Sequence, residues 1–157
     1  MNIALNVEQA VLQAYDDVSS GAASYAIFRY DGESIVVGAV GALDYRWSDL
    51  MAEFSDNDIC WALVNVKYRT VDGGHRCKLA LVMWVPDLRR DSVRETVMLK
   101  QCGVYGQQTL KKSMGMASCT IQANDAEDVT YASMLEKASR FERDAIDKSW
   151  DAPFLTE

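Results

Sequence analysis

Two apolar runs in the middle of the chain constrain the fold more than any other feature. Residues 59–68 begin with apolar side chains at consecutive positions, and residues 78–85 repeat the pattern until Pro86 ends it. Because neighbouring side chains of a strand point to opposite faces, a strand that is apolar on both faces must be covered on both sides. A turn sequence at 71–74 joins the two runs. They predict a central antiparallel pair with helices above and below it.

The N-terminal segment predicts a helix. Asn6 and Gln9 have the spacing of a capping box, in which Asn6 is the N-cap and Gln9 reaches back to it. Apolar residues then recur at helical spacing as far as Val18. Gly21, which can adopt a left-handed turn, is expected to end the helix.

A hairpin and a short helix are expected next. Residues 24–30 and 34–37 are rich in aromatic and β-branched side chains, and Asp31 and Gly32 separate them. An Asp-Gly pair readily adopts the positive φ angles of tight hairpin turns, so these runs predict paired strands. Aromatic and aliphatic residues within 44–54 then indicate a short helix.

A second capping box, formed by Ser92 and Glu95, predicts the start of another helix. Gly103 and Gly106 fall inside this helix, and glycine in a helix costs ~1 kcal/mol relative to alanine. We therefore expect one kinked helix or two consecutive pieces, the second of which covers residues 107–114.

The C-terminal part predicts a strand, a helix and a tail. Residues 117–123 read as a short strand, and Asn124 or Asp125 is expected to cap a last helix with an apolar stripe that includes Phe141. The periodicity is then lost, so residues 144–157 are expected to form a flexible tail after a domain at 1–143. The element order predicts one α/β layered domain with about five strands between helices.

The positive charge is concentrated in the middle third of the chain. Residues 65–112 hold ten basic and four acidic residues, whereas the rest of the chain holds six basic and nineteen acidic ones. Such asymmetry favours an acidic partner, although chance clustering on a solvated surface would look similar. The overall net charge of −7 opposes general attraction to nucleic acid. No signal peptide and no run of ~20 apolar residues is evident, so we expect a soluble protein that does not enter membranes.

The residues required for catalysis or for metal binding do not occur in recognisable patterns. His75 is the only histidine, and its neighbouring glycines suggest a surface turn. No acid stands at a recognisable spacing to orient it as a catalytic base. The four cysteines form no Cys-x-x-Cys pair and fit no common zinc pattern, so we expect reduced thiols. The sequence predicts neither an enzyme nor a cofactor or metal site.

Four stretches resemble one known family. Residues 28–38 resemble the coactosin hairpin, in which an aromatic-basic-Tyr-Asp-Gly turn precedes an Ile-Val strand that ends in glycine. Residues 76–84 resemble the coactosin strand that begins with basic residues and ends at tryptophan, and residues 84–87 are similar to the cofilin form of that corner. Residues 109–112 resemble the basic part of the long actin-facing helix. Residues 8–140 thus resemble the actin-depolymerising-factor homology (ADF-H) family, in its coactosin branch.

The resemblance implies a mixed five-stranded sheet between helices and a protein that binds actin without catalysis. It matches Lys78 to a lysine that is central to filament binding in coactosin, and Arg76 adds charge beside it. On the long helix it points to Lys111 and Lys112, with Met114 as an apolar neighbour. The further candidates are Arg89, Arg90, Arg94 and Lys100 near the helix start, and Glu136, Lys137 and Arg140 on the last helix.

The sequence leaves three functions open. Gln107 and Gln108 stand where cofilin has basic residues, which favours side-binding to filaments in the coactosin manner over strong monomer binding. A cofilin-like factor that binds monomers and severs filaments is the first alternative. A non-actin adaptor or chaperone on the same fold is the second. In each case we expect a monomeric protein of the cytoplasm, associated with the cytoskeleton in the first two.

Overall fold

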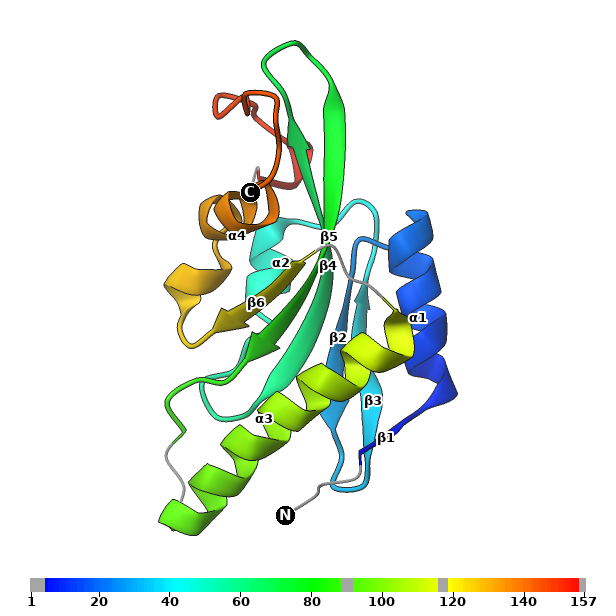
Figure 1. Cartoon of the computed structure of the whole chain (residues 1–157), viewed down its shortest axis with the longest axis vertical. Coiled ribbons are helices and arrows are strands. Elements are labelled where there is room, and N and C mark those ends of the chain that lie inside the picture. Colours follow the sequence, from blue (N-terminus) through cyan, green and yellow to red (C-terminus); the bar gives the residue numbers. More distant parts are fainter. Residues whose placement is uncertain (1–4, 89–91, 116–118, 156–157) are drawn as a thin grey trace.

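A mixed six-stranded sheet forms the centre of the molecule. The computed structural model describes residues 5–88, 92–115 and 119–155 (Figure 1). The strand order is β1-β3-β2-β4-β5-β6, in which the edge strands β1 and β6 run parallel to their neighbours and the other pairs are antiparallel. The layered α/β prediction is confirmed, with a short sixth strand in addition to the five expected. The strands are β1 (Asn6–Val7), β2 (Tyr25–Tyr30), β3 (Ser34–Gly41), β4 (Cys60–Arg69), β5 (His75–Trp84) and β6 (Cys119–Ala123).

Helices cover both faces of this sheet, and two hydrophobic cores result. One core lies between the sheet and helices α1 and α3, and the other lies between the sheet and α2, α4 and the C-terminal residues. Figure 1 shows α3 crossing one face while α4 packs beside β6. The helices are α1 (Gln9–Ser20), α2 (Trp47–Met51), α3 (Val93–Met114) and α4 (Tyr131–Ala138), with 3-10 turns η1 (Ala126–Val129) and η2 (Pro153–Leu155).

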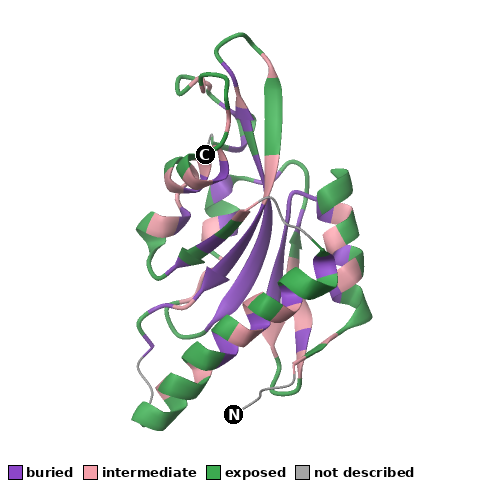
Figure 2. Cartoon of the chain, viewed as in Figure 1, coloured by how far each residue is buried: buried purple, intermediate pink, exposed green. Residues whose placement is uncertain are grey.

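The two apolar runs form the central antiparallel pair, β4 and β5, as predicted. Their register pairs Cys60 with Trp84 at one end and Arg69 with His75 at the other. Figure 2 shows that buried residues concentrate in the halves of these strands away from the turn, over residues 60–66 of β4 and 80–84 of β5, while the start of β5 is exposed. Strand β2 pairs with β4 only over residues 61–64. The far half of β4 therefore extends past β2 and pairs with β5 alone among the strands.

Helix α3 is continuous, and its two glycines bring it close to β4. A Cβ atom on Gly106 would lie 2.0 Å from Cζ2 of Trp61, a side chain with no exposed surface. The Trp61 indole donates a hydrogen bond to the carbonyl oxygen of Gly103 at 2.9 Å. Of the two predicted alternatives, a single helix is observed and two pieces is wrong, because these glycines serve a close helix–sheet approach rather than a break.

The first helix begins later than predicted. Asn6 lies in β1, where it pairs with Ser34, and therefore cannot cap the helix. Helix α1 starts at Gln9, and its N-cap Glu8 makes no side-chain cap hydrogen bond. Gly21 ends the helix with a φ of 86°, which confirms the predicted left-handed turn.

The last helix is shorter than predicted. Asp125 caps the 3-10 turn η1 rather than α4, which begins after Thr130. The Thr130 side chain accepts a hydrogen bond from the backbone N–H of Ser133. Helix α4 ends at Ala138, so Phe141 does not belong to its apolar stripe and is instead 91% exposed.

The segment expected to be a loose tail packs against the domain in its described part. We name residues 144–155 the C-terminal strap. Its Asp147 forms a 2.6 Å ion pair with Arg69. Backbone hydrogen bonds join the strap to the end of β4 that β2 does not reach. Ala152 and Phe154 are buried in the core beside α2. The strap supplies backbone partners and aromatic surface that the protruding hairpin cannot find within the sheet.

Gly106→Ala is expected to lower the free energy of unfolding by about 1–3 kcal/mol, because the new Cβ would overlap the immobile Trp61 ring. This figure is the net change, after the ~1 kcal/mol that alanine gains over glycine in helix propensity. Urea unfolding measures it. Gln108→Ala, at an exposed position of the same helix, is the matched control and should change stability by less than about 0.5 kcal/mol. Equal or higher stability of the Gly106 variant would contradict the close-approach explanation.

Phe154→Ala is expected to lower the free energy of unfolding by about 3–5 kcal/mol, because it leaves a cavity among Tyr45, Trp47 and Tyr131. Thermal and urea unfolding would show the change. Leu155→Ala, at the neighbouring exposed position, should have a small effect. If both variants unfold like the parent protein, the strap contributes nothing to the core and the original expectation of a loose tail stands.

Candidate functional site

The outer face of α3 presents apolar side chains to solvent. Positions 102, 106, 110 and 114 face the sheet and are buried. Val97 and Val104 lie on the opposite side, and Met98 stands one turn before buried Cys102; each keeps more than two fifths of its surface exposed. Polar and basic side chains flank them. We define the α3 outer face as Arg94, Val97, Met98, Gln101, Val104, Gln108, Lys111 and Lys112, all of which are exposed.

The start of α3 has a side-chain cap, and its last turn carries positive charges that suit the helix dipole. At the start, the Ser92 side chain accepts a hydrogen bond from the backbone N–H of Glu95 at 3.1 Å. Lys111 and Lys112 lie in the last turn, where positive charge is favourable by ~0.3–1 kcal/mol. Both lysines are exposed, so they combine a favourable position in the fold with availability to a partner.

Two residues of the long helix point inward, contrary to the earlier interpretation. Met114 is buried against the sheet and so offers no apolar contact beside the lysines. Gln107 donates a hydrogen bond to the carbonyl oxygen of Leu81 at 3.0 Å, so its amide faces β5 rather than a partner. Of the two glutamines that replace basic residues, only Gln108 lies on the outer face.

A second candidate surface lies where β5, β6 and the end of α4 meet. Lys78, Lys137 and Arg140 line a shallow pocket of about 390 Å³, with exposed Phe141 at its rim. We name these three cations the basic patch. No acid lines this pocket, and no ion pair within the described part of the chain involves any of the three. The structure thus brings together Lys78 and the α4 candidates from positions about 60 residues apart in the sequence.

Arg76 does not belong to the basic patch, because acidic side chains already pair with it. Its guanidinium lies 3.3 Å from Asp144 and 4.0 Å from Glu142, which offsets its charge. The Tyr68 hydroxyl donates a 2.6 Å hydrogen bond to Glu142. This hydrogen bond is the main reason why the pKa of Glu142 is below its usual value. Arg76 therefore fastens the start of the C-terminal strap.

The remaining candidates are dispersed. Arg89 and Arg90 lie outside the described residues. Arg94 is exposed in the first turns of α3, and Lys100 lines a different pocket beside Val104. Glu136 faces the groove between α4 and the C-terminal strap, and so does not join the basic patch.

The described residues offer no site for a metal ion and no membrane span. None of the groups of His, Cys, Asp and Glu side chains in this part of the chain could hold a metal. No helix within the described ranges is long and apolar enough to cross a bilayer. Burial raises the pKa of the Cys60 thiol to about 12 and that of Cys102 to about 11, so both stay protonated at neutral pH.

Comparisons with known proteins agree on one family. A family model described as cofilin/tropomyosin-type actin-binding protein matches residues 4–139. Cofilin from Yarrowia lipolytica is 27% identical over 138 residues, which cover 85% of this chain and 86% of that protein. The Streptomyces griseoflavus cofilin structure superposes with a TM-score of 0.74 at 22% identity, covering 87% of this chain and all of that one. Human coactosin-like protein gives a TM-score of 0.70 at 20% identity, covering 87% and 99%.

The exposed apolar residues of α3 should be dispensable for folding. Val104→Gln is expected to change the free energy of unfolding by less than about 0.5 kcal/mol, because Val104 is already 44% exposed. Leu110→Ala, on the buried side of the same helix, should cost about 2–5 kcal/mol. Urea unfolding of both variants provides the comparison. A large loss in the Val104 variant would show that the outer face is part of the core.

Proposed function

The chain belongs to the cofilin/tropomyosin-type actin-binding family, and on that premise we propose that it binds the sides of actin filaments without catalysing a reaction. The family supports binding to actin in the cytoplasm. The preference for filaments, and the coactosin manner of binding, rest on this chain's own residues.

The basic patch is the observation that carries the filament proposal. Lys78, Lys137 and Arg140 present three positive charges that form no ion pair among the described residues, and no acid lines the pocket that they share. An acidic polymer surface would be attracted to such a group over distances of about a Debye length, ~8–10 Å at physiological salt. The exposed ring of Phe141 can add apolar contact once the charges are aligned.

The α3 outer face favours a second candidate function, the binding of actin monomers. Val97, Met98 and Val104 form an exposed apolar row with basic residues at both ends, as in helices that lie in apolar grooves. The row lies on the face of the sheet opposite α4, so it can act independently of the basic patch. The relative from Yarrowia lipolytica is itself named cofilin, which adds to this alternative.

Pelleting with filamentous actin tests the filament proposal. The parent protein should co-sediment at low salt and lose binding as salt rises, because exposed charges are screened. The triple change Lys78→Ala, Lys137→Ala and Arg140→Ala should weaken binding at least tenfold. Lys148→Ala, an exposed lysine on the strap, should leave binding unchanged. A parent protein that stays in the supernatant at low salt would refute the proposal.

The same variants separate the two candidate functions. Val97→Gln combined with Val104→Gln should abolish any slowing of nucleotide exchange on monomeric actin, while the basic-patch triple variant should retain it. If the parent protein slows exchange and severs filaments seen by microscopy, the cofilin-like function is favoured. If it pellets with filaments and leaves exchange unchanged, the coactosin-like function is favoured.

A further inference from the structure

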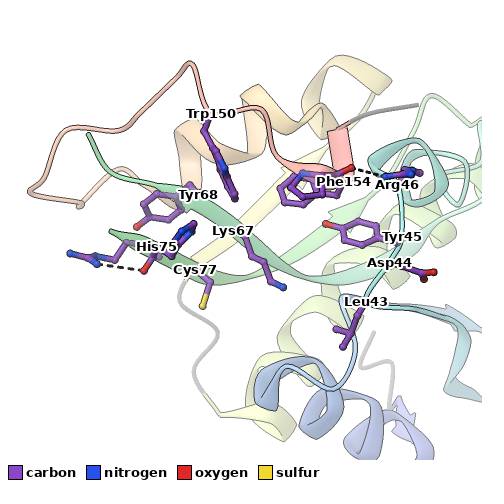
Figure 3. Close-up of a pocket in the computed structure, with 12 residues that line it drawn as sticks. Leu43, Asp44, Tyr45, Arg46, Lys67, Tyr68, His75, Cys77, Trp150 and Phe154 are labelled. Carbon is purple, nitrogen blue, oxygen red and sulfur yellow. Dashed lines mark hydrogen bonds between the residues drawn. The ribbon is translucent and has the colours of Figure 1, made fainter. Parts of the chain in front are cut away.

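A cavity of about 590 Å³ opens where the C-terminal strap crosses the β4–β5 hairpin (Figure 3). Its walls come from the segment before α2, the far halves of β4 and β5, and the strap. The volume lies within the range of small-molecule sites, ~300–1,000 Å³. Neither the α3 outer face nor the basic patch contributes to its lining, so the proposed actin contacts do not account for it.

Aromatic rings form a row along this cavity. The rings of His75 and Trp150 meet edge-to-face with centroids 5.7 Å apart, and Trp150 meets Phe154 in the same way at 6.0 Å. Phe154 then stacks on Tyr45 at 5.7 Å with an interplanar angle of 15°. Ring faces and edges of this kind provide favourable contacts for another planar aromatic group.

One cation of the cavity, Lys67, has neither an ion pair nor a side-chain hydrogen bond within the described part of the chain. Lys67 is exposed and forms no ion pair within the described ranges of the chain. By contrast, Arg76 pairs with two acids, and Arg46 donates to the carbonyl oxygen of Pro153 at 2.7 Å. In Figure 3 the carboxylate of Asp44, the lining acid, points away from the rings. The available charge therefore matches a ligand with a single negative charge.

The Tyr45 hydroxyl adds a neutral hydrogen-bond donor. Burial is the main reason why its pKa is well above the usual value, so the hydroxyl stays protonated. Tyr45 makes ring contacts, but its hydroxyl has no hydrogen-bond partner among the residues that the structure describes. Figure 3 shows this hydroxyl turned toward the strand that carries Lys67. Since Tyr45 lines the cavity, this hydroxyl can donate a hydrogen bond to a ligand that supplies an acceptor.

We propose that this cavity binds a small planar aromatic carboxylate. Its ring would lie against Trp150 and Phe154, and its carboxylate would accept hydrogen bonds from the Lys67 ammonium and the Tyr45 hydroxyl. A polyphosphate would bring more negative charge than one unpaired lysine can balance. This cavity shares no residue with the proposed actin-binding surfaces, so the proposal does not depend on the proposed function.

Isothermal titration with 2-naphthoate tests the proposal, with neutral 2-naphthamide as the matched probe. The carboxylate should bind at one saturable site, and the amide should bind at least tenfold more weakly. Cys77 lines the cavity and is the exposed cysteine, so its reaction with a thiol reagent should slow when 2-naphthoate is bound.

Two variants test the assigned contacts. Lys67→Gln should weaken 2-naphthoate binding by about tenfold, because a charge-assisted hydrogen bond is lost, and Tyr45→Phe should weaken it by about threefold or more. Lys112→Gln, the same charge change on α3, should bind like the parent protein. Circular dichroism confirms that each variant is folded.

Three results would overturn the proposal. One is the absence of saturable 2-naphthoate binding at millimolar concentration. The second is equal affinity for the acid and the amide, which would remove the role of the charge. The third is undiminished binding by the folded Lys67→Gln variant, which would place the probe elsewhere.

Discussion

The contact between Trp61 and the two glycines of α3 determines where the rest of the molecule can present its surfaces. The indole is fully buried, donates to the Gly103 carbonyl and occupies the space that a side chain at Gly106 would need. This contact packs one side of α3 against the start of β4, where Trp61 is the second residue. The opposite side must then face solvent, together with its valines and lysines. The exposure of the apolar outer face is thus a consequence of how α3 packs against Trp61.

The sequence pattern predicted the central strands well, because β4 and β5 are buried on both faces and their apolar runs are unmistakable. Gly103 and Gly106 suggest a weak helix from propensity, but propensity alone cannot show that Trp61 fills the space beside Gly106 and that Val85 lies against Gly103. The strap was missed for a similar reason. Its periodicity is absent because Phe154 and Asp147 are held by separate partners, Tyr45 and Arg69, which are distant in the sequence.

The candidate site was predicted in part. The family resemblance named Lys78, and separately Lys137 and Arg140, as candidates, but it did not predict that they line one pocket, and charge counting gave no reason to join them. Arg76 and Met114 were assigned to a partner but are used by the fold, the first in ion pairs and the second in the core. Such assignments depend on side-chain direction, which the sequence does not reveal at strand ends and helix termini. The aromatic cavity gave no sequence signal, because its walls come from three separate segments.

Hydrogen–deuterium exchange of the protein bound to actin tests the central claim most directly, because it reports both proposed surfaces in one experiment. On filaments, the account predicts slower exchange around the basic patch on β5 and α4, and on actin monomers it predicts slower exchange along the outer face of α3. The far end of the β4–β5 hairpin serves as an internal reference. Unchanged exchange in both surfaces, under conditions in which the protein is bound, would contradict the account.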